Sequence, residues 1–186
     1  GETNRLGHPR GEPSAALSPA QFVIFAQNHD QIGNRAFGDR LQTLVAPERL
    51  QLALALTALT PMIPLFFMGE PWGAREPFQF FTDFDAPLDQ AVREGRRAEF
   101  GQFKAFADPA AQATIPDPNA VTTFQASQSP LPSPEARQQN TWLAAFRSVL
   151  ALRWKYLVPQ LRQARSLGAE VIGNGAIRAG WQLGEG

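Results

Sequence analysis

Cysteine is absent from the 186 residues, so the chain has neither disulfides nor thiolate metal sites. The two histidines are too few for a histidine-rich zinc site. The 17 basic and 17 acidic residues cancel, so the chain lacks the basic field that attracts nucleic acid or an acidic membrane, and a neutral polysaccharide fits better as a partner. The longest apolar stretch is broken by Pro61 and Pro64 and is too short to span a bilayer. We therefore expect no metal, nucleic acid or membrane as a partner.

The most informative segment is an apolar run that ends in a dense polar cluster. Residues 22–26, Phe-Val-Ile-Phe-Ala, are typical of a strand that is buried on both faces of a parallel sheet or barrel. Residues 27–35, Gln-Asn-His-Asp-Gln-Ile-Gly-Asn-Arg, predict a polar loop at the C-terminal end of that strand. Ligands and catalytic side chains gather at this end of parallel β/α folds, because the loops after the strands converge there. The cluster is therefore the first candidate site.

A second strand is predicted over 65–68, and Glu70 follows its end. Between the strands, a helix is predicted over 47–59, with proline in its first position and leucine and alanine on nearly every side, so we expect it to be buried all round. A loop rich in aromatic residues follows the second strand and contains Trp72, Phe78, Phe80, Phe81 and Phe84. Two strands separated by a buried helix predict that residues 20–107 form two β/α units, with Asp30 and Glu70 at the same end of the sheet.

The remainder of the chain contains two more predicted helices. One is expected over 91–107, and the other over 140–157, where an apolar stripe of helical spacing is stopped by Pro159. The density of proline, serine, glutamine and asparagine over 108–134 predicts irregular structure, and residues 1–19 read as a loop. Beyond residue 167, short runs punctuated by glycine predict hairpin strands at 170–173, 176–179 and 181–183.

The polar cluster resembles a known family motif. Asn-His-Asp at 28–30, at the end of a strand, resembles the last conserved motif of the α-amylase-like glycoside hydrolases. The extension to Arg35 is more similar to the members of that family that cleave maltooligosyltrehalose and release trehalose. Three further segments fit the same pattern: 62–83, Gly-Arg-Arg-Ala-Glu-Phe at 95–100, and Ile-Pro-Asp-Pro at 115–118. Pro71 departs from it, since a second acidic residue is expected there. The resemblance covers roughly residues 20–160.

The resemblance implies a (β/α)8 TIM barrel in which the two apolar strands are the seventh and eighth. A complete barrel takes about 250 residues, so we expect this chain to be its C-terminal part. Residues 1–165 are then the last portion of the catalytic barrel, and residues 166–186 are the first strands of an all-β C-terminal domain. Part of a parallel barrel leaves open strand edges, so the remainder of the barrel is an expected partner. The family also implies a cytoplasmic enzyme without a cofactor.

Asp30 is the leading catalytic candidate. Retaining glycosidases use a carboxylate nucleophile and a carboxylic general acid, and the resemblance implies that Asp30 is a third carboxylate, which binds the sugar and stabilises the transition state. The structural alternative is an aspartate that caps a turn or pairs with Arg35 or Arg40. His29 would donate to a hydroxyl of the same sugar, and its alternative is a buried histidine bonded to a backbone carbonyl.

The substrate-binding candidates, besides His29, are Gln31, Gly33, Asn34, Arg35, Glu70 and Trp72. Amide and guanidinium donors suit the hydroxyls of trehalose, and Gly33 would let the backbone turn closely around a ligand. Glu70 has either a binding or a structural role, and pairing with Arg75 is its alternative. Trp72 would stack on a sugar face, whereas most of the phenylalanines after it are expected to fill the core.

The nucleophile and the general acid follow the fourth and fifth strands in the family, and residues 1–20 contain neither strand. We therefore expect the chain alone to be inactive. The leading interpretation is part of a retaining α-glycosidase that releases trehalose from maltooligosyltrehalose. One alternative is a branching or debranching enzyme, which would share Asp30 and His29 but not the whole extension. The other is a non-catalytic glucan-binding subunit.

Overall fold

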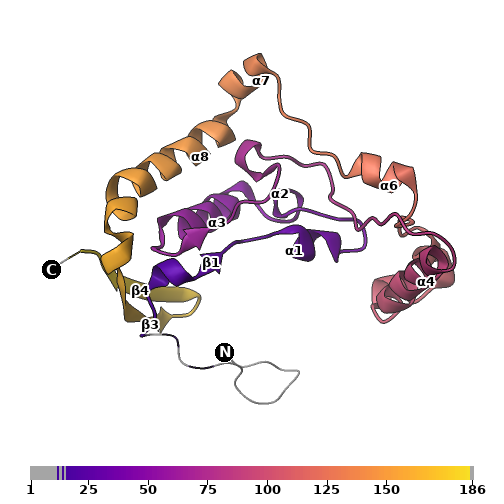
Figure 1. The fold of residues 1–186 in the computed structure, drawn as a ribbon, viewed down its shortest axis with the longest axis horizontal. Coiled ribbons are helices and arrows are strands. Elements are labelled where there is room, and N and C mark those ends of the chain that lie inside the picture. The colour runs from indigo at the N-terminus through magenta and orange to yellow at the C-terminus, as the bar shows by residue number, and fades with distance from the viewer. Residues whose placement is uncertain (1–11, 13, 15, 185–186) are drawn as a thin grey trace.

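The computed structural model describes residues 12, 14 and 16–184, so most of the loop predicted over 1–19 lies outside the described residues. In chain order the elements are η1 (Pro19–Gln21), β1 (Val23–Ile24), α1 (His29–Gly33), α2 (Leu41–Leu44), α3 (Pro47–Leu59), β2 (Ile63–Pro64), η2 (Glu70–Trp72), α4 (Leu88–Phe100), η3 (Lys104–Phe106), α5 (Pro109–Ala113), α6 (Val121–Ala126), α7 (Pro134–Gln139), α8 (Thr141–Leu152), η4 (Arg153–Leu157), η5 (Val158–Gln163), β3 (Arg165–Gly173) and β4 (Ala176–Gln182). Here η4 is a π-helical turn and the other η elements are 3₁₀ helices. Figure 1 shows β1 and α3 centrally, with α8 and α4 toward opposite sides.

The two apolar strands pair in parallel, as predicted, but both are shorter than expected. β1 covers two residues of the predicted 22–26, and β2 precedes the predicted 65–68, so the predicted position of the second strand was wrong. The register places Val23 beside Ile63. After β2 the chain continues to Gly69, whose φ of 91° turns it into η2. Both strands nevertheless run toward the segments that carry the predicted site.

The expected burial of β1 on both faces was also wrong. Val23 is 56% exposed, and Phe25 just beyond the strand is exposed as well. Ile63 and Leu65 on the neighbouring segment are exposed too. The reason is that β1 has a single strand neighbour, β2, in the part of the chain that the structure describes. The pair therefore presents apolar side chains that no described element covers.

Helix α3 has the predicted bounds, with Pro47 in its first turn. Its predicted burial on all sides was wrong, because one face packs and the other is open. Leu54 and Ala58 are buried and form a cluster with Phe146 of α8. Leu52 and Leu56 are exposed. A helix that is apolar all round but covered on one side carries a second, unpartnered apolar face.

Helix α8 begins at its Asn140 N-cap, whose Oδ1 accepts from the Leu143 amide at 2.8 Å, and the helix continues through η4, which confirms the second strong helix. Pro159 lies at the start of η5, where the 3₁₀ geometry begins. Arg153 is buried in η4 and donates to the carbonyl oxygens of Ala58, Thr60 and Met62 at 2.9, 2.6 and 2.6 Å. This one side chain therefore satisfies carbonyls at and after the end of α3.

The middle of the chain is more helical than predicted. The helix expected over 91–107 is α4 followed by the separate turn η3, and the stretch 108–134 contains α5 and α6. The expectation of irregular structure was therefore wrong for α5 and α6. For α5 the missed signal is Asp108 before Pro109: the Asp108 carboxylate caps the helix, and proline fills its first turn.

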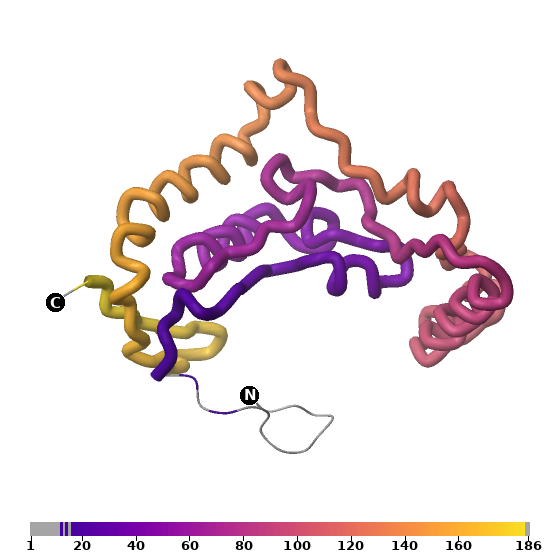
Figure 2. Tube along the Cα trace, viewed as in Figure 1, coloured from indigo at the N-terminus to yellow at the C-terminus, as the bar shows by residue number. Residues whose placement is uncertain are grey.

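The C-terminal residues form an antiparallel hairpin of β3 and β4, which confirms the predicted hairpin. The runs predicted separately at 176–179 and 181–183 are a single strand, β4, and β3 begins earlier than predicted, at Arg165. Gly175, at φ 75°, lies in the turn of the hairpin. The side chains of Leu167, Val171 and Ile177 are exposed. Figure 2 shows this hairpin and α4 well separated, on opposite sides of the central elements.

Candidate functional site

The polar cluster after β1 is a short helix and not the predicted open loop. Asn28 caps α1, because its Oδ1 accepts from the Asp30 amide at 2.8 Å and its own amide donates to Gln31 Oε1 at 3.0 Å. This reciprocal pair is a capping box, and Ile32 anchors the helix at 1% exposure. The signal was present in the sequence as an asparagine followed three residues later by a glutamine. Gln31 therefore has a structural task that the sequence analysis missed.

Asp30 and His29 lie side by side at the start of α1 and face solvent. The imidazole Nε2 is 3.4 Å from the Asp30 Oδ1, and their side chains are 67% and 66% exposed. Arg35 pairs instead with Asp39, at 3.4 Å, and Arg40 donates elsewhere. The alternatives of a buried histidine and of an aspartate paired with Arg35 or Arg40 are therefore not observed. Both groups are free to bind a ligand.

The end of α1 is fixed by Arg96 of α4. Its guanidinium donates to the carbonyl oxygens of Gly33 and Arg35 at 2.8 and 2.9 Å. A Cβ built on Gly33 would come no closer than 3.9 Å to the Phe78 carbonyl oxygen, so no close approach requires glycine there. The glycine that this loop does require is Gly38, which was missed and which has a φ of 70°.

Glu70 follows β2 and is buried, at 8% exposure. Its Oε2 accepts from the Phe67 amide at 2.8 Å. Burial raises the pKa of this carboxyl to about 7, although the Phe67 amide, the Gln27 side chain and the nearby Arg40 charge all favour the ionised form. Arg75, the alternative partner from the sequence, donates instead to the Gln42 carbonyl oxygen at 2.9 Å.

A buried polar cluster beside Glu70 was missed by the sequence analysis. Gln27, three residues after β1, donates through Nε2 to Gln42 Oε1 at 3.0 Å and accepts from the Leu41 amide at 3.0 Å. Arg40 is fully buried, and it donates to the Glu76 and Met68 carbonyl oxygens and to Ser129 Oγ. Burial lowers the pKa of Arg40, and the charges of Glu76 and Glu70 oppose this. The cluster joins the segments after β1 and β2.

Trp72 is half-buried in η2, which rests on the start of α8. Its carbonyl oxygen accepts from Asn140 Nδ2 at 2.9 Å, and the Trp142 indole donates to the Glu70 carbonyl oxygen at 2.9 Å. Of the phenylalanines after it, Phe78 and Phe81 stack edge to face with each other. This agrees with core filling for those two rings.

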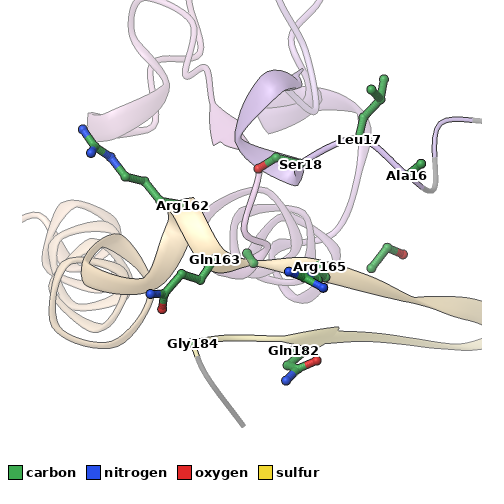
Figure 3. Close-up of a pocket in the computed structure, with 10 residues that line it drawn as sticks. Ala16, Leu17, Ser18, Arg162, Gln163, Arg165, Gln182 and Gly184 are labelled. Carbon is green, nitrogen blue, oxygen red and sulfur yellow. The ribbon is translucent and has the colours of Figure 1, made fainter.

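A cavity of about 770 Å³ among the described residues lies away from Asp30. Figure 3 shows that its lining comes from Leu17 and Ser18 on one side, and from the end of η5 and the hairpin on the other, with Arg165 and Gln182 labelled. Neither Asp30 nor Glu70 lines this cavity. No helix within residues 16–184 is long and apolar enough to cross a bilayer.

The comparisons give the resemblance a wider basis. Malto-oligosyltrehalose trehalohydrolase of Deinococcus radiodurans is 41% identical over 160 residues, which is 86% of this chain and 26% of that protein. Proteins of the same name from Arthrobacter ramosus and Saccharolobus solfataricus are 44% and 47% identical, over 72% and 58% of the chain and 22% and 19% of their own lengths. The chain is similar to one part of the malto-oligosyltrehalose trehalohydrolases. It spans about a quarter of the length of these relatives.

A solved structure agrees with the trehalohydrolase resemblance. A crystal structure of a Salmonella typhimurium protein assigned as an alpha amylase is 46% identical, with a TM-score of 0.73, and the match covers 89% of this chain and 28% of that one. The chain matches no protein-family model. The resemblance inferred from residues 28–35 is therefore confirmed, and so is the mixed α and β fold.

Within the segment that resembles the trehalohydrolases, the predicted site residues fall into two groups. Asp30, His29, Asn34 and Arg35 are exposed on and just after α1. The Gln31 side chain caps α1, and the Gly33 carbonyl oxygen accepts from Arg96, so both stabilise α1. In η2, the Glu70 carboxylate accepts from the Phe67 amide and the Trp72 carbonyl oxygen accepts from Asn140. The first group presents exposed polar side chains to a ligand, and so does Gln31, whose Oε1 is used in the capping box.

Proposed function

We propose that this chain supplies the C-terminal part of the catalytic (β/α)8 barrel of a retaining glycoside hydrolase that cleaves maltooligosyltrehalose and releases trehalose. The observation that carries the proposal is the exposed Asp30 and His29 pair at the C-terminal end of β1, in a segment similar to the trehalohydrolases. Residues 1–165 belong to the barrel and residues 166–186 begin a separate β domain. The hairpin starts at Arg165, close to that boundary.

In the proposed site Asp30 stabilises the transition state. Its carboxylate accepts hydrogen bonds from hydroxyls of the sugar ring at the cleaved bond, and such bonds strengthen as the ring distorts toward the oxocarbenium ion. His29 donates to the same ring. Asn34 and Arg35 bind the part of the substrate beyond it. Glu70 and the cluster around Arg40 support the site without touching the substrate, because they hold the segment after β2 against the segment after β1.

The remainder of the barrel is the proposed partner. The exposed apolar residues of the β1–β2 pair and of the open face of α3, among them Val23, Ile63 and Leu56, support this assignment. Isolated apolar side chains at a surface are ordinary, but a strand pair and a helix face left open together indicate an interface. The nucleophile and the general acid come from that remainder.

The test is Asp30→Asn in the complete protein that carries this chain, assayed for release of trehalose from maltotriosyltrehalose. The amide is nearly isosteric and neutral. We therefore expect the activation free energy to rise by several kcal/mol, on the order of a charged hydrogen bond or more, and turnover to fall accordingly. The fold should survive, because the Asp30 carboxylate has no hydrogen bond or ion pair within the described residues other than the one with His29.

The matched control is Asp85→Asn, which removes an exposed carboxylate from the aromatic loop. Its turnover should equal that of the wild type. Near-native turnover of Asp30→Asn would remove Asp30 from the mechanism. Wild-type protein that cleaves branched glucan or plain maltooligosaccharides but not maltotriosyltrehalose would overturn the proposed substrate.

A further inference from the structure

A hollow of about 400 Å³ lies between the end of α1 and η3, next to the proposed site. One wall carries the polar side chains of Asn34, Arg35 and Asp39, and the other carries the rings of Phe37, Phe103 and Phe106. We propose that this hollow binds a glucopyranose ring of the substrate, separate from the ring at Asp30. The volume of the hollow is within the range of small-molecule sites, about 300–1,000 Å³. The identity of the ligand rests on the proposed function.

The aromatic wall is held from behind and open in front. The Phe37 and Phe106 ring centroids are 5.8 Å apart, and Phe100 lies 5.6 Å from Phe106 and 6.0 Å from Phe103. Phe100 is buried, whereas Phe37 and Phe103 are 39% and 58% exposed. Phenyl rings that pack against one another and stay partly exposed can contact the apolar face of a pyranose ring.

The polar wall has free hydrogen-bonding capacity. The Asn34 side chain has no partner among the residues that the structure describes, and an amide of this kind offers both donors and an acceptor. Arg35 contacts Asp39 only through Nε, at 3.4 Å, and both side chains are more than a third exposed. Its terminal guanidinium nitrogens therefore keep donors for a ligand. Sugar hydroxyls donate and accept, so they match this mixed set.

The hollow is fixed relative to Asp30. Arg96 donates to the Gly33 and Arg35 carbonyl oxygens and lies 5.0 Å from the Phe100 ring, so it joins the polar wall to the aromatic wall. Asp30 and Asn34 are four positions apart on and after α1, which corresponds to about 6 Å along a helix. A glucan with one ring at Asp30 therefore has its next rings within reach of the hollow.

The test is calorimetric titration of the complete protein with trehalose and, separately, with maltotetraose. The background is Asp30→Asn, which suppresses cleavage during the measurement. Phe103→Ala and Asn34→Ala are the variants, and Phe84→Ala is the matched control, because Phe84 is equally an exposed phenylalanine but lies outside the hollow. We expect the dissociation constant for one of the two sugars to rise about tenfold in both variants and to stay unchanged in the control.

The affected sugar identifies the part of the substrate that occupies the hollow. Weaker trehalose binding assigns it to the trehalose end, and weaker maltotetraose binding assigns it to the glucan end. Unchanged affinity for both sugars in both variants would overturn the inference, and so would wild-type protein that binds neither. Because binding is measured without cleavage, protein that fails to hydrolyse maltotriosyltrehalose but loses sugar affinity on Phe103→Ala would refute the proposed function alone.

Discussion

Replacement of Glu70 by glutamine provides a sharp test of the buried carboxyl. Its pKa is about 7 in the folded protein and close to 4.5 when it is exposed on unfolding. Well below pH 4.5 the carboxyl is protonated in both states, so its ionisation does not change the free energy of unfolding. As the pH rises from 4.5 to 7, the unfolded chain releases this proton while the folded protein keeps it, so the free energy of unfolding falls. Above pH 7 the loss is constant.

The magnitude follows from the shift. A difference of about 2.5 pKa units at 1.36 kcal/mol each corresponds to about 3 kcal/mol of stability that is present at low pH and lost by pH 8. Glu70→Gln keeps an oxygen that can accept from the Phe67 amide but does not titrate. Relative to wild type, the variant should therefore gain about 2–3 kcal/mol of stability between pH 5 and pH 8.

The assay is guanidinium unfolding at several pH values, followed by tryptophan fluorescence. The indole of Trp142 donates to the Glu70 carbonyl oxygen, so the probe lies at the perturbed residue. Glu48→Gln, which removes an exposed carboxylate from the first turn of α3, is the matched control. A constant difference between wild type and Glu70→Gln from pH 5 to pH 8 would show that Glu70 does not titrate in this range.

The remaining predictions concern the supports of the site. Gly38→Ala should lower the free energy of unfolding by about 2 kcal/mol or more, since φ is 70° and a Cβ would lie 2.5 Å from Phe78 backbone atoms. Gly33→Ala should change the free energy of unfolding by no more than about 1 kcal/mol, and chemical denaturation would measure both variants. Arg40→Lys leaves one ammonium for three acceptors and should cost about 3 kcal/mol, seen as a lower Tm. Asn28→Ala should cost about 1 kcal/mol through loss of the α1 cap, and faster amide exchange in α1 would show it.

The elements that the sequence predicted well carry their own signals. Helix α3 begins at Pro47, which supplies a helix start, and α8 begins after the Asn140 cap and presents one apolar stripe. The position of Asp30 after an apolar strand was likewise readable from the local pattern. None of these depends on a distant part of the chain.

The features that were missed depend on tertiary contacts or on a pattern with two meanings. Gln31 was assigned to ligand binding as a polar residue, although it forms a capping box with Asn28. Arg40 and Arg153 bond to carbonyl oxygens of segments that only the fold brings close. The raised pKa of Glu70 likewise arises from burial, which its strand-end position does not reveal.

The contact of Arg153 with the Met62 carbonyl oxygen joins residues 91 positions apart. The chain between them is a loop tied at its base, from β2 through α4 to α8. The entropy of closing such a loop rises only with the logarithm of its length, so doubling the length costs about 0.6 kcal/mol. Extra residues in an exposed turn of this stretch therefore add little to the cost of closing it while that contact remains, whereas changes at Ser127 or Ser129 would also remove hydrogen bonds with Gln79 and Arg40.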